Sequence, residues 1–375
     1  MLPKISAFAL LCGLFCALFA HDHGQRKIVF PDVPGYYTLK CDFHQHTVFS
    51  DGNVWPNIRV QEGLRDGLDA ISVTDHIEYQ PHLADIPHPD RNRSYEIAAK
   101  AAEGTELLVV RGAEITRGMP PGHCNAIFVE DVNKLMVEDP MEAFREAKKQ
   151  GAFTFCNHPN WIAHRSDGIA TLADMHRTLI AEGLINGIEV VNEDTYSEEA
   201  LRIGLDNNLT LMGTSDIHGL IDWDYNVPAG GHRPVTLVFA KERTFEAIRE
   251  GLLAGRTVVW FNNTLVGREA YLKPLLVSSL SVSAGKALTN RDGATTVFEF
   301  EIENSSDANL IVENLSDFTL HQHANILVFP AHEKTRIQIK PRERKAVFQM
   351  KLTVLNAITA PDQHPELVLD LRLGE

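Results

Sequence analysis

Histidines and carboxylates stand at short, regular spacings in this sequence, and the spacings are typical of metal ligands. In CDFHQHTVFSDG, His44 and His46 are two residues apart and Asp51 follows in an aspartate-glycine turn. Asp216 and His218 repeat the spacing of two in SDIH. Alternate residues of an extended strand point to the same side about 6.6 Å apart. Each pair can therefore converge on one ion.

Further candidate ligands stand singly beside other apolar runs. They are His76 in VTDH, Glu114 in GAEI, His123 in GHCN and His158 in CNHP. A lone histidine at a strand end is more often a hydrogen-bonded bystander than a ligand, and the chain holds 17 histidines. The joint pattern of two spaced pairs, single histidines and a glutamate favours a metal centre.

Apolar, β-branched runs alternate with helical patterns through about the first 260 residues. Seven runs are expected to be strands: YTLKCDF, LDAISVT, TELLVVRGAEI, CNAIFV, AFTFCN, GIEVVN and LTLMGTS. Helical stretches such as DPMEAFREAKKQG lie between most of them. Strand–helix–strand units make parallel strands with right-handed crossovers, so we expect a closed or nearly closed α/β barrel. Chemistry in such folds gathers at the carboxyl ends of the strands, and His123 departs from this rule because it precedes its strand.

The pattern changes near Leu272, after which we expect no helix. Short alternating runs such as TTVFEFEIEN and ELVLDLRLG, separated by turn residues, predict a small all-β, Ig-like sandwich. The predicted division is a signal peptide over residues 1–20, an α/β barrel domain over 21–274 and the sandwich over 275–375.

The amino terminus has the pattern of a secretory signal, with Lys4 before an apolar run that ends at Ala20 and a polar HDHG after it. The run is shorter than the roughly 20 residues that a membrane span needs. We therefore expect cleavage near Ala20, no membrane span afterwards and a periplasmic or extracellular protein. An uncleaved anchor is the alternative. The three cysteines that remain, Cys41, Cys124 and Cys156, favour small buried thiols over a disulfide framework.

Charge limits the partners of the chain. The formal net charge is -15 over 375 residues. A nucleic-acid duplex or an anionic membrane needs a basic face, so neither is expected as the main partner. An acidic ligand must then find local positive charge, such as bound metal ions. The chain could also form a homo-oligomer.

The motifs together resemble the PHP (polymerase and histidinol phosphatase) superfamily of metal-dependent phosphoesterases. The resemblance covers roughly residues 38–260 and rests on DFHQHTVFSDG, VTDH, GAEI, GHCN, NHP and SDIH. It implies a distorted seven-stranded barrel that holds two to three divalent ions, namely zinc, manganese or iron. By motif, the ligands are His44, His46, Glu114 and Asp216 for the first ion, Glu114, His123 and His158 for the second, and Asp51, His76 and His218 for the third. Where many relatives have an aspartate after the VTDH histidine, this chain has Ile77, so substrate classes tied to that residue stay open.

The resemblance and the charges together predict the reaction. Three ligand carboxylates and neutral imidazoles around three divalent ions leave the site about three charges positive, which suits an anion. We expect hydrolysis of a small phosphate ester, monoester or diester, by a hydroxide that bridges two ions, with Glu114, His158 and Asp216 as catalytic residues. Arg117 and Arg233 are expected to bind phosphate oxygens, with ordinary loop contacts as the alternative.

Two other functions compete with this reading. A metal-dependent amidohydrolase also begins with a strand-end histidine pair, but it has no use for the third-ion residues. A noncatalytic module could bind a glycan or a partner through the sandwich and carry a degenerate barrel. All nine ligand positions are filled, which disfavours degeneration.

Overall fold

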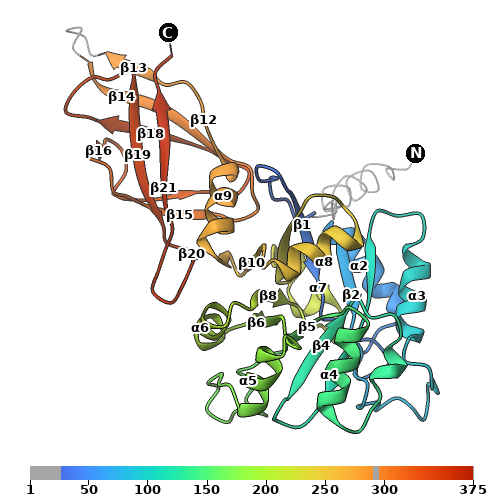
Figure 1. The fold of residues 1–375 in the computed structure, drawn as a ribbon. Coiled ribbons are helices and arrows are strands. Elements are labelled where there is room, and N and C mark those ends of the chain that lie inside the picture. Colours follow the sequence, from blue (N-terminus) through green and yellow to red (C-terminus); the bar gives the residue numbers. More distant parts are fainter. Residues whose placement is uncertain (1–26, 290–294, 375) are drawn as a thin grey trace, which may run out of the picture.

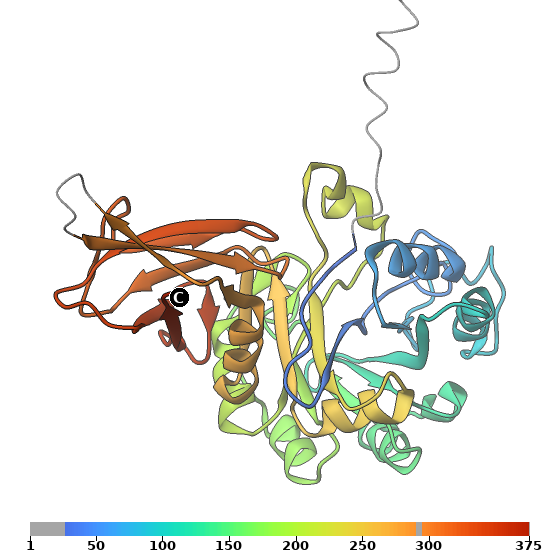
Figure 2. The ribbon, with the colours of Figure 1, turned by 90° about the horizontal axis from the view of Figure 1, so that it is seen from above.

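The chain has an α/β part followed by an all-β part, as Figures 1 and 2 show for the computed structural model. The structure describes residues 27–289 and 295–374, so the predicted signal peptide lies outside the described residues. Among the helices of the described ranges, none has both the length and the apolar character to cross a bilayer. The predicted fold class, a distorted α/β barrel before an Ig-like sandwich, is confirmed.

The α/β part is built on one curled sheet of 12 strands. In chain order they are β1 (Tyr37–Asp42), β2 (Ala70–Val73), β3 (Leu108–Thr116), β4 (His123–Ile127), β5 (Phe153–Cys156), β6 (Gly187–Asn192), β7 (Thr195–Tyr196), β8 (Thr210–Thr214), β9 (Val235–Ala240), β10 (Thr257–Phe261), β11 (Thr264–Gly267) and β20 (Ala357–Ile358). The helices are α2 (Pro56–Asp66), α3 (Arg93–Ala102), α4 (Pro140–Lys149), α5 (Asp174–Ala181), α6 (Glu198–Asp206), α7 (Ile221–Asp224) and α8 (Phe245–Leu253), with 3-10 turns η1 (Val132–Leu135) and η2 (Val227–Ala229). The seven predicted strands correspond to β1–β6 and β8.

Several helices start where the sequence supplies a cap. Asp139 accepts a hydrogen bond from the Met141 backbone N–H at the start of α4, and Thr244 does the same for Ala247 at the start of α8. Such caps satisfy backbone donors that the first turn leaves free. In α4 the buried Ala143, Phe144 and Ala147 follow the helical period and cover the sheet.

The expectation of uniformly parallel strands is wrong at β4, and β9, which was not among the predicted strands, is antiparallel too. β4 pairs antiparallel with both β3 and β5, and β9 pairs antiparallel with β1. Only residues 117–122 join β3 to β4, and a parallel crossover needs a dozen residues or more, so the chain must turn back. This reversal brings the first residue of β4, His123, opposite Thr116 at the end of β3. His123 thus reaches the same end of the sheet as the carboxyl ends of its neighbours.

The sheet closes where β8 meets β9 and β10. The Thr236 hydroxyl accepts from the Gly213 N–H and donates to the Gly213 carbonyl, and Thr257 donates to the carbonyl of Leu211. A Cβ on Gly213 would lie 2.2 Å from Val259 Cγ1, so only glycine permits this approach. Beyond the strand ends, Gln45 forms a parallel bridge with Ile217. Closure therefore brings the loops after β1 and β8 together.

The expectation of no helix beyond Leu272 is also wrong. α9 spans Glu269–Ser279 and stands at the junction of the two parts (Figure 1). Leu272, Leu275 and Leu276 recur at helical spacing and are buried. Their burial stabilises a helix here, although apolar and polar residues alternate in the segment that follows, as in a strand. The predicted division between residues 274 and 275 falls within α9 and stays a prediction.

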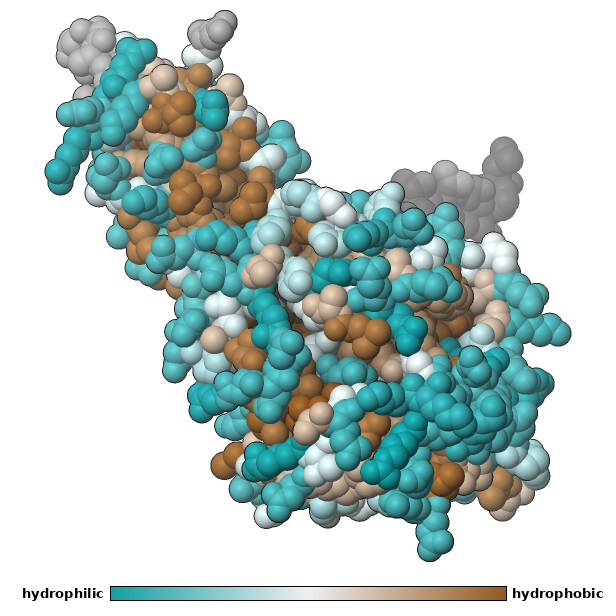
Figure 3. All heavy atoms as spheres, in the orientation of Figure 1, coloured by the Kyte–Doolittle hydropathy of each residue, from teal (hydrophilic) through white to brown (hydrophobic). Residues whose placement is uncertain are grey.

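The all-β part consists of two packed sheets. One contains β12 (Leu280–Val282), β13 (Lys286–Thr289), β14 (Thr295–Asn304), β16 (Thr319–Leu320) and β18 (Lys334–Lys340), and the other contains β15 (Leu310–Asn314), β17 (Ile326–Phe329), β19 (Val347–Val354) and β21 (Glu366–Arg372). Buried and exposed residues alternate strictly along β21, as expected for a strand with one face on the core. On the face in Figure 3, hydrophilic residues cover most of the α/β part, and apolar residues are prominent on the sandwich.

The two parts share one hydrophobic cluster. It runs from Leu237 and Trp260 of the barrel through Leu275 of α9 to Phe298 and Phe348 of the sandwich. In addition, β20 leaves the sandwich and pairs parallel with β11 at the edge of the barrel sheet. The sandwich therefore contributes directly to the packing of the barrel.

Candidate metal centre

The nine predicted ligands meet around one cavity of about 540 Å³. Eight of them line it, and the ninth, His44, is fully buried next to them. The other lining residues are Tyr79, Thr116, Trp161, Asn192 and Glu193. Residues from seven separate stretches of the chain are thus brought to one site by the curled sheet.

Strand ends and turns direct the ligands into the cavity. His76 follows β2 and forms a bridge with Glu114, whose own strand, β3, continues to Thr116. His158 and Asp216 follow β5 and β8, and their φ angles are 27° and 48°. Non-glycine residues in this left-handed region carry strain of roughly 1–3 kcal/mol, which is commonly found at functional sites.

Four ligands form the tightest group, which corresponds to the first predicted ion. His44 Nε2 lies 2.9 Å from Glu114 Oε2 and 3.0 Å from Asp216 Oδ1. His46 Nε2 lies 3.4 Å and 2.9 Å from the same two oxygens. The two histidine nitrogens are 3.1 Å apart. All four atoms therefore face one point.

The second predicted group is less compact. Glu114 Oε1, the other oxygen of the shared carboxylate, lies 2.7 Å from His123 Nδ1 and 3.1 Å from His76 Nδ1. His158 instead approaches Asp216, with 3.9 Å between Nε2 and Oδ2. The structure therefore groups His76 with Glu114 and His123. His158 lies outside this compact group, although its ring packs against that of His123 with centroids 5.1 Å apart.

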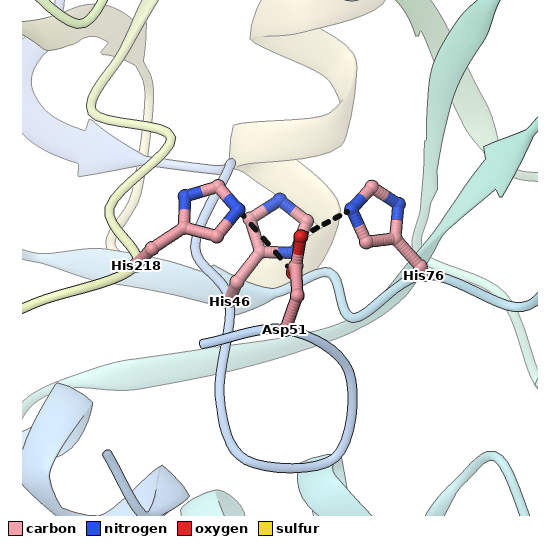
Figure 4. Close-up of side chains that lie close together, drawn as sticks. All are labelled: His46, Asp51, His76 and His218. Carbon is pink, nitrogen blue, oxygen red and sulfur yellow. Dashed lines mark ion pairs between the residues drawn. The ribbon is translucent and has the colours of Figure 1, made fainter. Parts of the chain in front are cut away.

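The third predicted group is centred on Asp51 (Figure 4). Its two oxygens lie 3.4 Å from His76 Nε2 and 3.3 Å from His218 Nε2. His46 joins this group through Nδ1, which is 3.7 Å from Asp51 Oδ1. His46 thus presents one ring nitrogen to each of two neighbouring groups.

These separations fit divalent cations. Two ligands bound about 2.1 Å from one ion stand roughly 3.0 to 3.4 Å apart in octahedral or tetrahedral geometry. The histidine–carboxylate pairs of the first and third groups lie 2.9 to 3.4 Å apart, except for His46 Nδ1 and Asp51 Oδ1 at 3.7 Å. In addition, Asp51 Oδ1 and Asp216 Oδ1 are buried acceptors without a well-aligned hydrogen bond from any described residue. The donor set of imidazoles and carboxylates suits zinc, manganese or iron.

Opposite charges couple the ligands to one another. Burial is the largest influence on the pKa of His44 and lowers it, but Asp216 and other carboxylates outweigh burial and raise that pKa well above its usual value. Burial is likewise outweighed at His76, mainly by Glu114, and the pKa rises to about 10. At His158 burial prevails and lowers the pKa. Metal ions would compete with these protons, because histidine binds metal in its neutral form.

A buried carboxylate that sequence reasoning missed supports the first group. Glu189 on β6 lies with Oε1 2.8 Å from His44 Nδ1, and it accepts hydrogen bonds from the hydroxyl of Thr214 and the backbone N–H of His158. Asn192 also donates to it. Such contacts orient ligand imidazoles and raise their basicity. The signal in the sequence was one charged residue inside the apolar run GIEVVN.

Two further buried charges hold the loops that carry ligands. Asp75 accepts from the Thr47 N–H and hydroxyl and from the Ser50 hydroxyl, which fixes the turn before Asp51. Arg59 of α2 donates to the backbone carbonyls of His46 and His218. The loops that carry candidate ligands are therefore held by buried groups that do not line the cavity.

The structure pairs the side chains of Arg117 and Arg233, the two arginines expected to bind phosphate, with other groups of the protein. Arg233 is 1% exposed, and its guanidinium lies between Asp42 and Asp66, with N–O distances of 3.1 Å and 2.7 Å. Arg117 pairs with Glu78 at 2.7 Å and donates to two backbone carbonyls. Neither lines the cavity. Both guanidinium groups are already engaged within the protein.

The comparisons with known proteins agree with this geometry. Residues 280–370 match a family model described as an Ig-like domain, DUF5001. The crystal structure of a two-domain protein from Bacteroides vulgatus ATCC 8482, which contains a predicted PHP-like metal-dependent phosphoesterase, has 42% sequence identity and a TM-score of 0.84. The match covers 92% of this chain and 98% of that one.

Other matches are much weaker. PsfC from Pseudomonas syringae PB-5123 has 16% identity and a TM-score of 0.41 over 64% of this chain and 96% of its own, which is too distant to bear on function. No curated protein matches the chain. The Bacteroides match spans nearly the whole of both chains, and the ligand motifs lie together in space. The chain therefore belongs to the two-domain, PHP-like metal-dependent phosphoesterases.

Proposed function

We propose that this chain hydrolyses small phosphate esters, either monoesters or diesters, at the cavity lined by its histidines and carboxylates. The observation that carries the proposal is the convergence of three ligand groups on one cavity of about 540 Å³. The name of the Bacteroides relative points to the same class of reaction.

Charge supports an anionic substrate. Asp51, Glu114 and Asp216 bring three negative charges to the ligand groups, and the adjoining Glu189 brings a fourth. Three divalent ions would bring six positive charges, so the ligand groups together with Glu189 would be about two charges positive. No lysine or arginine lines the cavity in the described part of the chain. Bound cations are thus the main source of attraction for a phosphate.

The residues of the chain have distinct tasks in this proposal. Divalent ions, when bound, supply Lewis-acid polarisation of the phosphoryl group and lower the pKa of water, the nucleophile. Glu114 presents its two oxygens to two groups of ligands, so it would set the spacing between two ions. His158 and Asp216 would complete the innermost groups, and His218 with Asp51 would hold the outer one.

Export, the small phosphate-ester partner, the absence of duplex nucleic acid as a ligand and the formation of a homo-oligomer stay proposals. A protein recovered outside the cytoplasm that begins near His21 would support export. Size-exclusion chromatography with light scattering would test the oligomeric state.

The test of the activity combines metal analysis with substrate hydrolysis. Purified protein, loaded in turn with zinc, manganese or iron, is assayed for phosphate release from ethyl phosphate, for cleavage of a methyl phosphodiester, and against amide and lactone substrates. We expect hydrolysis of a phosphate ester that a chelator abolishes and added metal restores. Asp216→Asn should remove it, whereas the exposed Asp194→Asn should not. Cleavage of amides or lactones without any action on phosphate esters would refute the proposal.

A further inference from the structure

One side of the cavity is aromatic. Tyr79, in the loop after β2, packs edge-on against His76 with ring centroids 5.7 Å apart. Trp161, in the loop after β5, lies against His123 at 5.5 Å and His158 at 5.2 Å. Both rings line the cavity and stay open to solvent, with exposed fractions of 52% for Tyr79 and 43% for Trp161.

These two rings are held in place on the same side. The histidines on which they pack, His76 and His123, are themselves neighbours, with ring centroids 5.5 Å apart. Trp161 is further fixed by His164, which stands edge-on to it at 4.7 Å. A phosphoryl group held by the ligands beneath would therefore leave the organic part of its ester next to exposed aromatic surface.

The remaining lining is polar, and its charge is negative. Glu193 and Asn192, at the turn after β6, line the cavity beside Asp216 and His218. The Glu193 side chain is exposed to solvent, and its carboxylate adds a negative charge to this part of the lining. No lysine or arginine of the described residues lines this cavity, so neither of these side chains is there to pair with a second negative charge on the substrate.

We infer that the organic part of the substrate is a flat ring without negative charge, which lies against Tyr79 and Trp161. The inference rests on the proposed phosphoesterase activity and names its substrate class. Aromatic rings gain from edge-on or offset contact beyond what apolar burial supplies. A flat ring should therefore be preferred over a puckered ring of similar size, and a ring with a carboxylate should be disfavoured by Glu193.

The experiment uses esters that share the same reacting group. The full chain, loaded with metal, is assayed with 2-phenylethyl phosphate, 2-cyclohexylethyl phosphate, 2-(4-carboxyphenyl)ethyl phosphate and ethyl phosphate. All are primary alkyl phosphates, so leaving-group chemistry differs little. We expect kcat/KM for the phenyl ester to exceed that for the cyclohexyl ester by roughly 3- to 10-fold. The carboxyphenyl ester should be a poorer substrate than the phenyl ester.

Variants assign the preference to the named residues. Trp161→Leu and Tyr79→Leu should each remove most of the preference for the phenyl ester, measured as the ratio of kcat/KM for the phenyl ester to kcat/KM for the cyclohexyl ester. Glu193→Gln should narrow the gap between the phenyl and carboxyphenyl esters. Trp223→Leu is the matched control, because Trp223 is 78% exposed and does not line the cavity. The inhibition constants of 2-phenylethylphosphonate and 2-cyclohexylethylphosphonate can also be compared, because they measure binding without turnover.

The outcomes separate the two proposals. Hydrolysis of ethyl phosphate with equal kcat/KM for the phenyl and cyclohexyl esters would overturn the ring inference and leave the phosphoesterase proposal standing. So would a Trp161→Leu variant that loses activity equally on all four esters. If none of the four esters is hydrolysed, the phosphoesterase proposal fails and the inference fails with it.

Discussion

Glu189 offers the sharpest test of how the first ligand group is built, because it touches that group without lining the cavity. The change Glu189→Gln keeps the size of the side chain and removes its charge. In the structure Glu189 is 1% exposed. Its Oε1 faces His44 Nδ1 at 2.8 Å and the Thr214 hydroxyl at 2.5 Å, and its Oε2 faces the His158 N–H at 2.6 Å and the Asn192 amide at 2.9 Å.

The magnitude follows from these four contacts. Each oxygen serves two donors, and a glutamine has only one carbonyl oxygen, so two donors would face its NH₂ group. Two lost hydrogen bonds at roughly 1 to 2 kcal/mol each lower the free energy of unfolding by about 2 to 4 kcal/mol. Loss of the partner of a ligand imidazole should also weaken metal binding about 10- to 100-fold, or roughly 1.4 to 2.7 kcal/mol.

The assay is competition between the protein and a chelator for one metal, together with urea unfolding of the metal-free protein. Asp194→Asn is the matched control, since Asp194 is an exposed carboxylate on the turn after the same strand. We expect Glu189→Gln to release metal at a chelator concentration at least 10-fold lower than the control does. If both variants release metal at the wild-type chelator concentration, the proposed role of Glu189 is refuted.

Four other tests address the remaining structural features. Glu114→Ala should lower the metal content by more than one ion, because the two oxygens of Glu114 face two ligand groups. His218→Ala should lower the metal content by about one ion. Equal metal contents in the two folded variants would contradict the assignment of three ligand groups. Arg233→Ala should lower the free energy of unfolding by about 3 to 5 kcal/mol, as expected when one partner of a buried ion pair is removed. A stable variant with a raised KM would instead support a role of Arg233 in substrate binding. Asn356→Ala should cost about 2 to 4 kcal/mol in urea unfolding, because this side chain makes three hydrogen bonds at the junction, one to Asn263 of the barrel and two to Asn309 and Ile311 of the sandwich. An unchanged midpoint would show that these contacts are not stabilising. In the metal-free protein the pKa of His76 is raised from 6.5 to about 10, so the stabilisation by this group is complete below pH 6.5 and lost as the pH rises through 10. Urea unfolding at both pH values should show this decline in the free energy of unfolding, and His76→Gln should make the decline smaller. A decline that the substitution leaves unchanged would contradict the assignment.

The convergence of the candidate ligands was predictable from the sequence because the pattern resides in residue types and short spacings. His44 and His46 flank one residue after an apolar strand, and Asp216 and His218 repeat that arrangement. All nine predicted positions lie around the cavity. The assignment of each residue to an individual ion is not tested by the positions alone and stays a prediction. The barrel and the sandwich were predictable for a similar reason, since alternation and β-branched runs report local burial.

The features that sequence reasoning missed depend on contacts between distant segments. Nothing in the sequence indicated that Asp42 and Asp66, far away in the chain, would surround the Arg233 guanidinium in the fold. The helical state of α9 depends on the junction where Leu272 and Leu275 are buried. A pattern along the chain indicates which residues are apolar or ionisable, but it does not indicate which of them will pair.

The direction of β4 shows how the fold determines which side chains meet at the site. His123 precedes its strand, which would place it at the wrong end of a uniformly parallel barrel. The six residues between β3 and β4 force the chain back, and the reversal sets His123 beside Glu114. Closure of the sheet at Gly213 then brings Asp216 to His44 and His46 from the opposite side. The second ligand group therefore depends on one short connection and the first on one glycine, although neither feature contributes an atom to the metal centre.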